Sequence, residues 1–111
     1  MNNFNLLAEF EKEFKRLGKK YKTLNDDFEK FKKVLLITPT GIGKNFVIIH
    51  TSPLVKIIKA RMACRALRNR SLRIIYTFFE QNQQIEFIEI YFKGEKENEN
   101  RERIKEYLKN F

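Results

Sequence analysis

Apolar residues recur at a helical spacing near the start of the chain. Over residues 8–21 they stand three or four positions apart, with Glu and Lys between them, at Phe10, Phe14, Leu17 and Tyr21. This spacing places the four side chains on one side of a helix, so it predicts an amphipathic helix over residues 8–21.

A second helical pattern follows after a short break. Residues 23–26, Thr-Leu-Asn-Asp, resemble a capping box, in which the Thr23 hydroxyl would accept a hydrogen bond from the third amide of the helix. The apolar stripe of this helix continues until Pro39 and consists of Phe28, Phe31, Val34 and Leu35. Neither stripe is wide enough to form a core alone, so we expect a helical hairpin that packs on a sheet.

Beyond Pro53 the pattern changes to the alternation of a strand with one buried face. In residues 58–65 the even positions are apolar, whereas Lys59, Arg61 and Arg65 point the other way. Residues 71–79 and 84–93 are rich in β-branched and aromatic side chains, and the polar residues 80–83 form a hairpin loop between them. These segments predict a small antiparallel sheet.

The last predicted element is a charged helix over residues 97–108. Its apolar stripe is narrow, because it contains only Ile104, Tyr107 and Leu108, so we expect this helix at the edge of the sheet. The predicted fold class is therefore α+β: an N-terminal helical hairpin packed on a small antiparallel β-sheet, with a C-terminal helix. With 111 residues, the chain is expected to form a single domain over 1–111.

Composition excludes several classes of protein. With 42% hydrophobic residues and only four Gly and two Pro, the chain is not disordered. No apolar run approaches the ~18 residues of a membrane span, and no signal peptide precedes the first helix, so we expect a cytoplasmic protein. Cys64 is the only cysteine and is expected to be a buried, inert thiol, while His50, the only imidazole, is expected in a loop. Neither a metal site nor a cofactor is expected.

Positive charge is concentrated in one third of the chain. Residues 44–79 contain eight Lys or Arg and no Asp or Glu, which gives this segment a charge of +8 in a protein whose net charge is +9. Concentrated like charge opposes compaction, so the segment indicates an anionic partner such as nucleic acid.

A phosphate-binding P-loop is a tempting interpretation of residues 38–45, but the sequence argues against it. Thr38 stands where the first Gly of that motif is needed, and Asn45 stands where a Ser or Thr should hold magnesium. The residues that follow are β-branched, whereas a bound phosphate needs a helix N-terminus. We interpret the segment as a turn that ends the second helix.

The usual acid–base pairs are also missing. Glu86 and Glu89 are expected on opposite faces of their strand, so they cannot act together. What remains is the set of Lys and Arg on one face of the sheet. Because their own segment has no acidic residue to pair with them, we interpret this face as a phosphate-binding surface.

The predicted order of elements, together with "KAR" at 59–61, "LRIIY" at 72–76 and "IYFKGEKEN" at 90–98, resembles the RelE/ParE toxin superfamily, and RelE/HigB-type toxins most of all. The resemblance covers the chain from about Phe4 to Leu108. It implies the toxin of a type II toxin–antitoxin pair. Many such toxins cleave messenger RNA on the ribosome without a metal, and a sister branch inhibits DNA gyrase.

Carried onto this sequence, the resemblance assigns catalytic roles to Lys59, Arg61 and Arg73. Residues expected to bind flanking RNA are Lys56, Arg65, Arg68, Arg70, Tyr91, Lys93 and Lys96. Tyr91 is the nearest substitute for an aromatic residue that stacks on a base in some members. A further family arginine, after the last strand, has no counterpart.

The implied reaction is attack of a ribose 2′-hydroxyl on the adjacent phosphate. Arg61 and Arg73 would bind the non-bridging oxygens, and Lys59 would be the base, because a cationic neighbourhood lowers the pKa of an amine. The implied partners are messenger RNA, the ribosome and an antitoxin with an acidic segment, with no membrane and no small-molecule cofactor. Two alternatives stay open: a gyrase inhibitor of the same fold, and a non-enzymatic module that binds RNA or an acidic protein.

Overall fold

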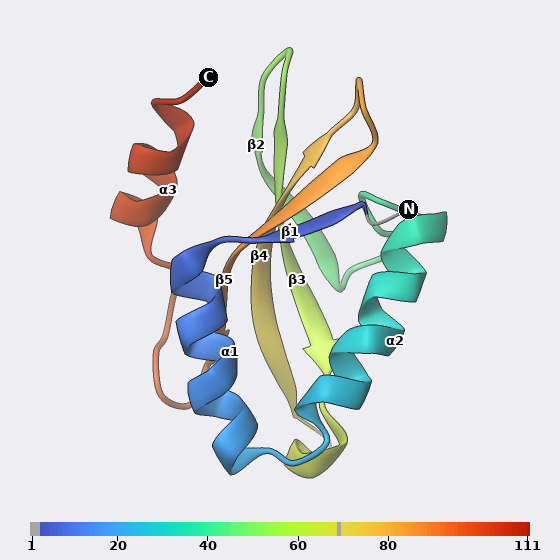
Figure 1. Ribbon diagram of the computed structural model, residues 1–111, viewed down its shortest axis with the longest axis vertical. Helices are drawn as coiled ribbons and strands as arrows, with labels where there is room; N and C mark the ends of the chain where they lie inside the picture. Colours follow the sequence, from blue (N-terminus) through green and yellow to red (C-terminus); the bar gives the residue numbers. More distant parts are fainter. Residues whose placement is uncertain (1–2, 69) are drawn as a thin grey trace.

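In the computed structural model, which describes residues 3–68 and 70–111, three helices pack on a five-stranded sheet (Figure 1). The sheet order is β1-β5-β4-β3-β2. The elements are β1 (Phe4–Leu6), α1 (Ala8–Lys20), α2 (Leu24–Ile37), β2 (Phe46–Thr51), β3 (Lys56–Ala63), the 3₁₀ turn η1 (Arg65–Leu67), β4 (Ser71–Phe79), β5 (Gln84–Phe92) and α3 (Arg101–Leu108).

The α+β class is confirmed, but the prediction of a purely antiparallel sheet is wrong. The neighbours from β2 to β5 are antiparallel, whereas β1 runs parallel to β5. The two edge strands were not predicted, because β1 is only three residues long and β2 exposes apolar side chains instead of alternating. His50 accordingly lies in β2 and not in a loop.

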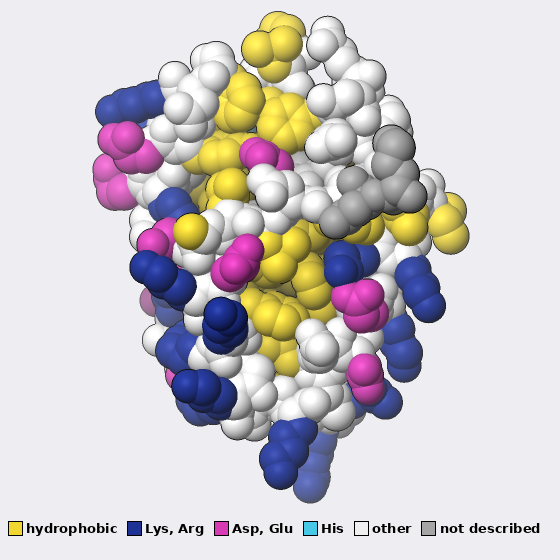
Figure 2. Space-filling model, in the orientation of Figure 1, with side chains coloured by type: hydrophobic (Ala, Val, Ile, Leu, Met, Phe, Trp, Pro, Cys, Tyr) yellow, Lys and Arg dark blue, Asp and Glu magenta, His cyan; other side chains and the backbone are white. Residues whose placement is uncertain are grey.

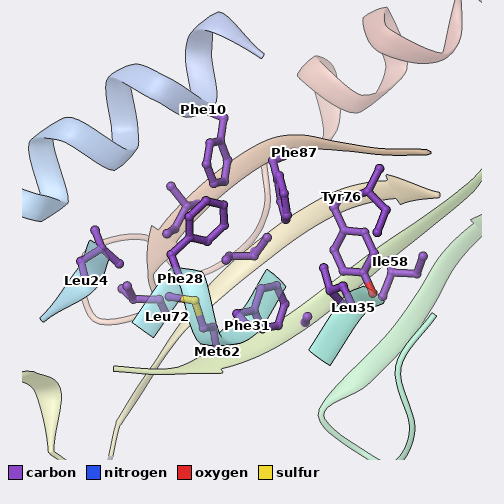
Figure 3. Close-up of a cluster of buried hydrophobic side chains, with 14 of the residues drawn as sticks. Phe10, Leu24, Phe28, Phe31, Leu35, Ile58, Met62, Leu72, Tyr76 and Phe87 are labelled. Atoms are coloured by element: carbon purple, nitrogen blue, oxygen red, sulfur yellow. The ribbon is translucent and has the colours of Figure 1, made fainter. Parts of the chain in front are cut away.

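One face of the sheet carries α1 and α2 and holds the larger core. Phe87 of β5 lies at its centre, with ring centroids 5.3 Å from Phe10 of α1 and 4.9 Å from Phe28 of α2 (Figure 3). Full burial of each such ring contributes roughly 1.5–3 kcal/mol. The helices diverge away from their connecting turn, and apolar side chains are visible between them (Figures 1 and 2). Val34, predicted in the core, is 47% exposed and borders a hollow between α2 and the strands β2 and β3.

The turn between α1 and α2 does not contain the predicted capping box. The Thr23 hydroxyl makes no cap bond to its own helix; it donates to Asp27 Oδ2 at 2.8 Å and accepts from the Ala66 N–H at 2.9 Å. Thr23 therefore joins the start of α2 to η1. Cys64 lies beside this junction and is buried, as predicted.

The opposite face of the sheet is covered at one end by α3. A second apolar cluster joins Ile104 and Tyr107 of α3 to one isoleucine from each of three strands, Ile57, Ile75 and Ile88. The predicted position at the sheet edge is therefore wrong. The helix also begins at Arg101, later than predicted, because the Asn100 side chain accepts a hydrogen bond from the Arg103 N–H and caps it. With eight residues, α3 leaves the rest of this face uncovered.

A β-bulge in β5 changes which side chains share a face. Ile75 pairs with Glu89 and the next residue, Tyr76, pairs with Phe87, so Ile88 is an extra residue in β5. Glu86 and Glu89 consequently both face the C-terminal segment: Glu86 accepts from the Tyr107 hydroxyl at 2.6 Å, and Glu89 accepts from the Asn100 N–H at 2.8 Å. The prediction that they lie on opposite faces is wrong.

Residues 38–45 form the predicted turn after α2. Gly41 and Gly43 have φ of 75° and 89°, which glycine adopts without strain. The Phe46 ring occupies the space where a Cβ on Gly41 would lie. The turn thus leads directly from α2 into β2 and forms no phosphate cradle on a helix N-terminus.

Candidate functional site

A cationic cleft lies on the part of the second sheet face that α3 leaves uncovered. It has a volume of about 490 Å³ and is lined by Arg61, Arg70, Ser71, Arg73, Phe92, Lys93 and Gly94. We refer to this set of residues as the cationic cleft. Its floor comes from the ends of β3, β4 and β5, which are central strands and hold the side chains in a fixed register.

Arg61 and Arg73 form the centre of the cleft. They are directly opposite each other on β3 and β4, an arrangement that destabilises a sheet when both side chains are charged. Within the described residues, no carboxylate lies within 4.0 Å of either guanidinium; Arg73 Nη1 donates only to Ser71 Oγ at 3.0 Å. Partial burial, and then the charge of Arg61, lower the pKa of Arg73 from its usual value. This pair therefore favours a bound anion that bridges the two guanidiniums.

A second hollow continues from the cleft toward β2 and α3. It shares Arg61, Arg73 and Lys93 with the cleft, and its other lining residues are Lys44, Asn45, Val47, Ile49, Lys59 and Glu99. The Asn45 carbonyl accepts a hydrogen bond from the Arg61 N–H at 2.9 Å, which fixes Lys44 and the start of β2 against β3. Lys59 and Arg61 share a face of β3, as predicted.

Lys59 is paired, and its pKa moves in the direction opposite to the prediction. Its Nζ donates to Glu99 Oε1 at 2.8 Å, and this hydrogen bond raises the Lys59 pKa above its usual value despite partial burial. The prediction of a lower pKa considered only the neighbouring cations, whereas Glu99, which is 40 residues away in the chain, raises the pKa of Lys59. The predicted lowering of the Lys59 pKa is therefore wrong, and the assignment of Lys59 as the base loses the argument on which it was based.

Three residues predicted to bind RNA have carboxylate partners within the fold. Lys56 Nζ lies 2.5 Å from Glu80 Oε1, and Arg65 Nε lies 3.0 Å from Asp27 Oδ1. Lys96 pairs with the fully buried Glu89. The acid-free segment is therefore neutralised in part by carboxylates from other segments, which the local count of charges could not show.

The remaining predicted residues divide between the cleft and its surroundings. Arg70 and Lys93 line the cleft, and the Arg70 guanidinium lies 5.7 Å from the centroid of the partly buried Phe92 ring. Arg68 is exposed after η1 and is not a lining residue. Tyr91 is only 3% exposed, with Lys96 Nζ 5.3 Å from its ring centroid. A buried ring cannot stack on a base, so that role for Tyr91 is wrong.

Sequence reasoning missed Lys44, Ser71 and Glu99 as members of the site. Ser71 had a usable signal, because it stands two residues before Arg73 and so shares its strand face. Lys44 and Glu99 had none, since the first depends on how β2 pairs with β3 and the second on the path of the segment between β5 and α3.

A comparison of this chain with protein-family models found no match, and a search of curated proteins found none either. No described helix is long and apolar enough to cross a membrane. The described residues also contain no group of three or more His, Cys, Asp or Glu side chains able to hold a metal ion.

Proposed function

We propose that this chain is a RelE-like toxin of a type II toxin–antitoxin pair that cleaves messenger RNA on the ribosome. Two lines of argument support the proposal: the sequence resemblance to RelE/HigB-type toxins, and a cationic cleft built from two of the three residues that the resemblance assigns to catalysis. The third, Lys59, lies in the adjoining hollow.

The observation that carries the proposal is the position of Arg61 and Arg73, which lie opposite each other on neighbouring strands with no carboxylate partner within the described residues. A sheet gains stability from opposite charges across strands, so two arginines placed opposite each other without a carboxylate between them reduce the stability of the fold. Such a pair is useful where an anion binds, because each guanidinium can donate two parallel hydrogen bonds to phosphate oxygens.

The chemistry needs little more than positioned cations. Attack of the 2′-hydroxyl on phosphorus places extra negative charge on the non-bridging oxygens, which Arg61 and Arg73 would stabilise. By analogy with donors of an oxyanion hole, each contributes about 2–4 kcal/mol to the transition state. The need for a 2′-hydroxyl restricts the reaction to RNA. Lys93 and Arg70, at the rim, would bind the neighbouring phosphates.

The partner that restrains such a toxin must neutralise the same cleft. Buried, unpaired cations are strongly unfavourable, so apolar contacts alone cannot cover this surface. We therefore propose an antitoxin that presents acidic side chains to Arg61, Arg73 and Lys93.

Growth inhibition in a bacterial host tests the proposal. Wild-type chain should arrest growth when expressed alone, and Arg61→Ala and Arg73→Ala should each abolish the arrest while the thermal transition stays nearly unchanged. Arg16→Ala is the matched control, because Arg16 is exposed on α1, which covers the opposite face, and should stay toxic. Full toxicity of both cleft variants, or DNA-damage signalling in place of translation arrest, would contradict the proposal.

A further inference from the structure

Glu99 is the acidic side chain that lines the cationic part of this face. It lies on the segment between β5 and α3, is 10% exposed, and borders the same hollow as Arg61 and Arg73. Lys59 Nζ donates to its Oε1 at 2.8 Å. The inference below rests on the proposed function and concerns which groups move protons in that reaction.

Two other carboxylates near α3 have both oxygens occupied. Glu89 accepts from Lys96 and from the Asn100 N–H, and Glu13 binds the Arg103 guanidinium with both oxygens, at 2.8 and 3.0 Å. In Glu99, by contrast, Lys59 donates to Oε1 and the residue's own backbone N–H also interacts with the carboxylate, but no described side chain donates a hydrogen bond to Oε2. Its nearest ion-pair partner is Arg101 Nε at 3.8 Å, which is longer than a hydrogen bond. This oxygen can therefore accept a proton.

We propose that Glu99 is the general base of the cleavage reaction and that Lys59 is its general acid. Glu99 Oε2 removes the proton of the 2′-hydroxyl as the 2′-oxygen forms its bond to phosphorus. As the bond from phosphorus to the 5′-oxygen breaks, Lys59 Nζ transfers a proton to that oxygen. The products are a 2′,3′-cyclic phosphate and a 5′-hydroxyl, and no metal or other reactant enters the balance.

The hydrogen bond between the two residues also restores the starting state. After the reaction Glu99 holds one extra proton and Lys59 lacks one. Rotation of the neutral Glu99 carboxyl group turns its protonated oxygen toward Lys59 Nζ, and transfer of that proton within the pair returns both groups to their initial charges. One pair thus supplies both proton transfers, which explains why a chain without a usable histidine or paired carboxylates can perform them.

The charge states agree with these roles. Burial acts to raise the pKa of Glu99, but the Lys59 hydrogen bond, a hydrogen bond from its own backbone N–H and the charges of Lys59 and Arg101 hold it below its usual value, so the carboxylate is ionised at neutral pH. Lys59 remains protonated. A substrate phosphate brings negative charge into the cleft, which opposes the neighbouring cations and makes Glu99 a stronger base once RNA is bound.

These assignments predict a rate that falls at low pH, as Glu99 becomes protonated, and at high pH, as Lys59 loses its proton. The cations that face Glu99 from the surrounding elements are Lys44, Lys59, Arg61, Arg73, Lys93 and Arg101. Tyr91 and His50 also border this region. Because His50 is the only imidazole in the sequence and lies near this region, His50→Gln is a required control, and the fall of its rate at low pH (the acidic limb) should match that of the wild type.

The test is single-turnover cleavage of a translated messenger RNA on purified ribosomes. Glu99→Gln should lower the cleavage rate about 100-fold or more and remove the fall in rate at low pH. Its binding to ribosomes should be unchanged or tighter. Glu99→Asp should retain part of the rate and shift the acidic limb. Glu97→Gln, an exposed change two residues away, should cleave like the wild type.

A Glu99→Gln rate equal to that of the wild type would overturn the inference while the proposed function stands. A faster rate would show that Glu99 only competes with the phosphate. If Glu99→Gln does not fold, an acidic limb that is the same in Glu99→Asp and the wild type overturns the inference instead. Absence of cleavage by the wild type would overturn both the inference and the proposed function.

Discussion

Among single residues, Asp27 shows how a side chain from a helix can determine the shape of a distant loop. Burial acts to raise its pKa, but the Arg65 N–H, the Thr23 hydroxyl and the Arg65 guanidinium together hold the pKa below its usual value. The carboxylate ties α2 to η1, just after β3 and before the strand that carries Arg73. Its ionised form therefore stabilises the folded state.

Asp27→Asn should lower the free energy of unfolding by about 1–3 kcal/mol at pH 7, because the partly buried hydrogen bonds from Thr23 and Arg65 lose their charged acceptor. Since the folded-state pKa lies below the unfolded value of about 3.9, this contribution is complete above that pH and is lost as pH falls through the folded value. Urea unfolding at pH 7 and pH 3 measures it. Asp26→Asn, at an exposed neighbour, should change little. An equal loss at both pH values would contradict this account.

Lys96 was predicted from sequence to bind RNA, but its partner Glu89 is completely buried. Lys96→Ala should therefore lower the unfolding free energy by about 1–3 kcal/mol, less than a fully buried pair would, because Lys96 is itself partly exposed. Lys93→Ala, three residues away on the rim of the cleft, should instead weaken binding without changing stability. Thermal unfolding of both variants separates the two roles, and equal transition temperatures would count against a structural role for Lys96.

At the scale of elements, both polar and apolar contacts hold α3 in place. Arg103 binds both oxygens of Glu13 of α1 and also donates from Nη1 to the Ile88 carbonyl of β5 at 3.0 Å. The apolar contribution comes mainly from Ile104 and Tyr107. Because Glu99 lies just before this helix, the docking of α3 determines where Glu99 sits relative to the cleft.

Arg103→Ala should release α3 before the rest of the molecule unfolds, since Glu13 is left partly buried without its cation. Amide exchange should accelerate over residues 101–108 and stay unchanged in β3 and β4. Lys105→Ala, an exposed change on the same helix, is the control. Uniform acceleration across the sheet would show that α3 is not a separate unit.

The elements differ in how far the sequence could predict them. The strands β3, β4 and β5 and the stripes of α1 and α2 follow from periodicity, because each has one side against the larger core. The edge strand β2 could not be predicted, since Val47, Ile48 and Ile49 are all exposed. The bulge at Ile88 and the position of α3 depend on packing between distant segments. Arg61 and Arg73 could be found from the sequence because they lie in strands that periodicity predicts. Glu99 could not, because it lies on the segment before α3, whose position depends on packing between distant segments.

At the scale of the whole molecule, the positive charge of residues 44–79 is only partly neutralised by carboxylates from other segments. Of the +8 in residues 44–79, Lys56, Lys59 and Arg65 have carboxylate partners. The other five have none within the described residues, and three of them, Arg61, Arg70 and Arg73, line the cleft, where they are available to an anionic ligand.

Binding to single-stranded RNA should therefore weaken steeply with salt. Each phosphate neutralised contributes about 0.7 to the slope of log K against log salt, so one phosphate shared by Arg61 and Arg73 and one each at Lys93 and Arg70 give a slope near −2. Lys93→Ala should reduce the magnitude of the slope by about 0.7, and Arg16→Ala should leave it unchanged. Fluorescence titrations between low and physiological salt measure it, and a flat response would exclude a phosphate-binding cleft.

The most direct test of the central claim is a map of messenger RNA 5′ ends in a purified translation system. With wild-type protein, new 5′-hydroxyl ends should appear inside translated transcripts and be absent from an untranslated copy of the same RNA. They should disappear with the Arg61→Ala, Arg73→Ala double variant, whose fold should be intact. Translated transcripts that remain whole in the presence of active wild-type protein would contradict the account.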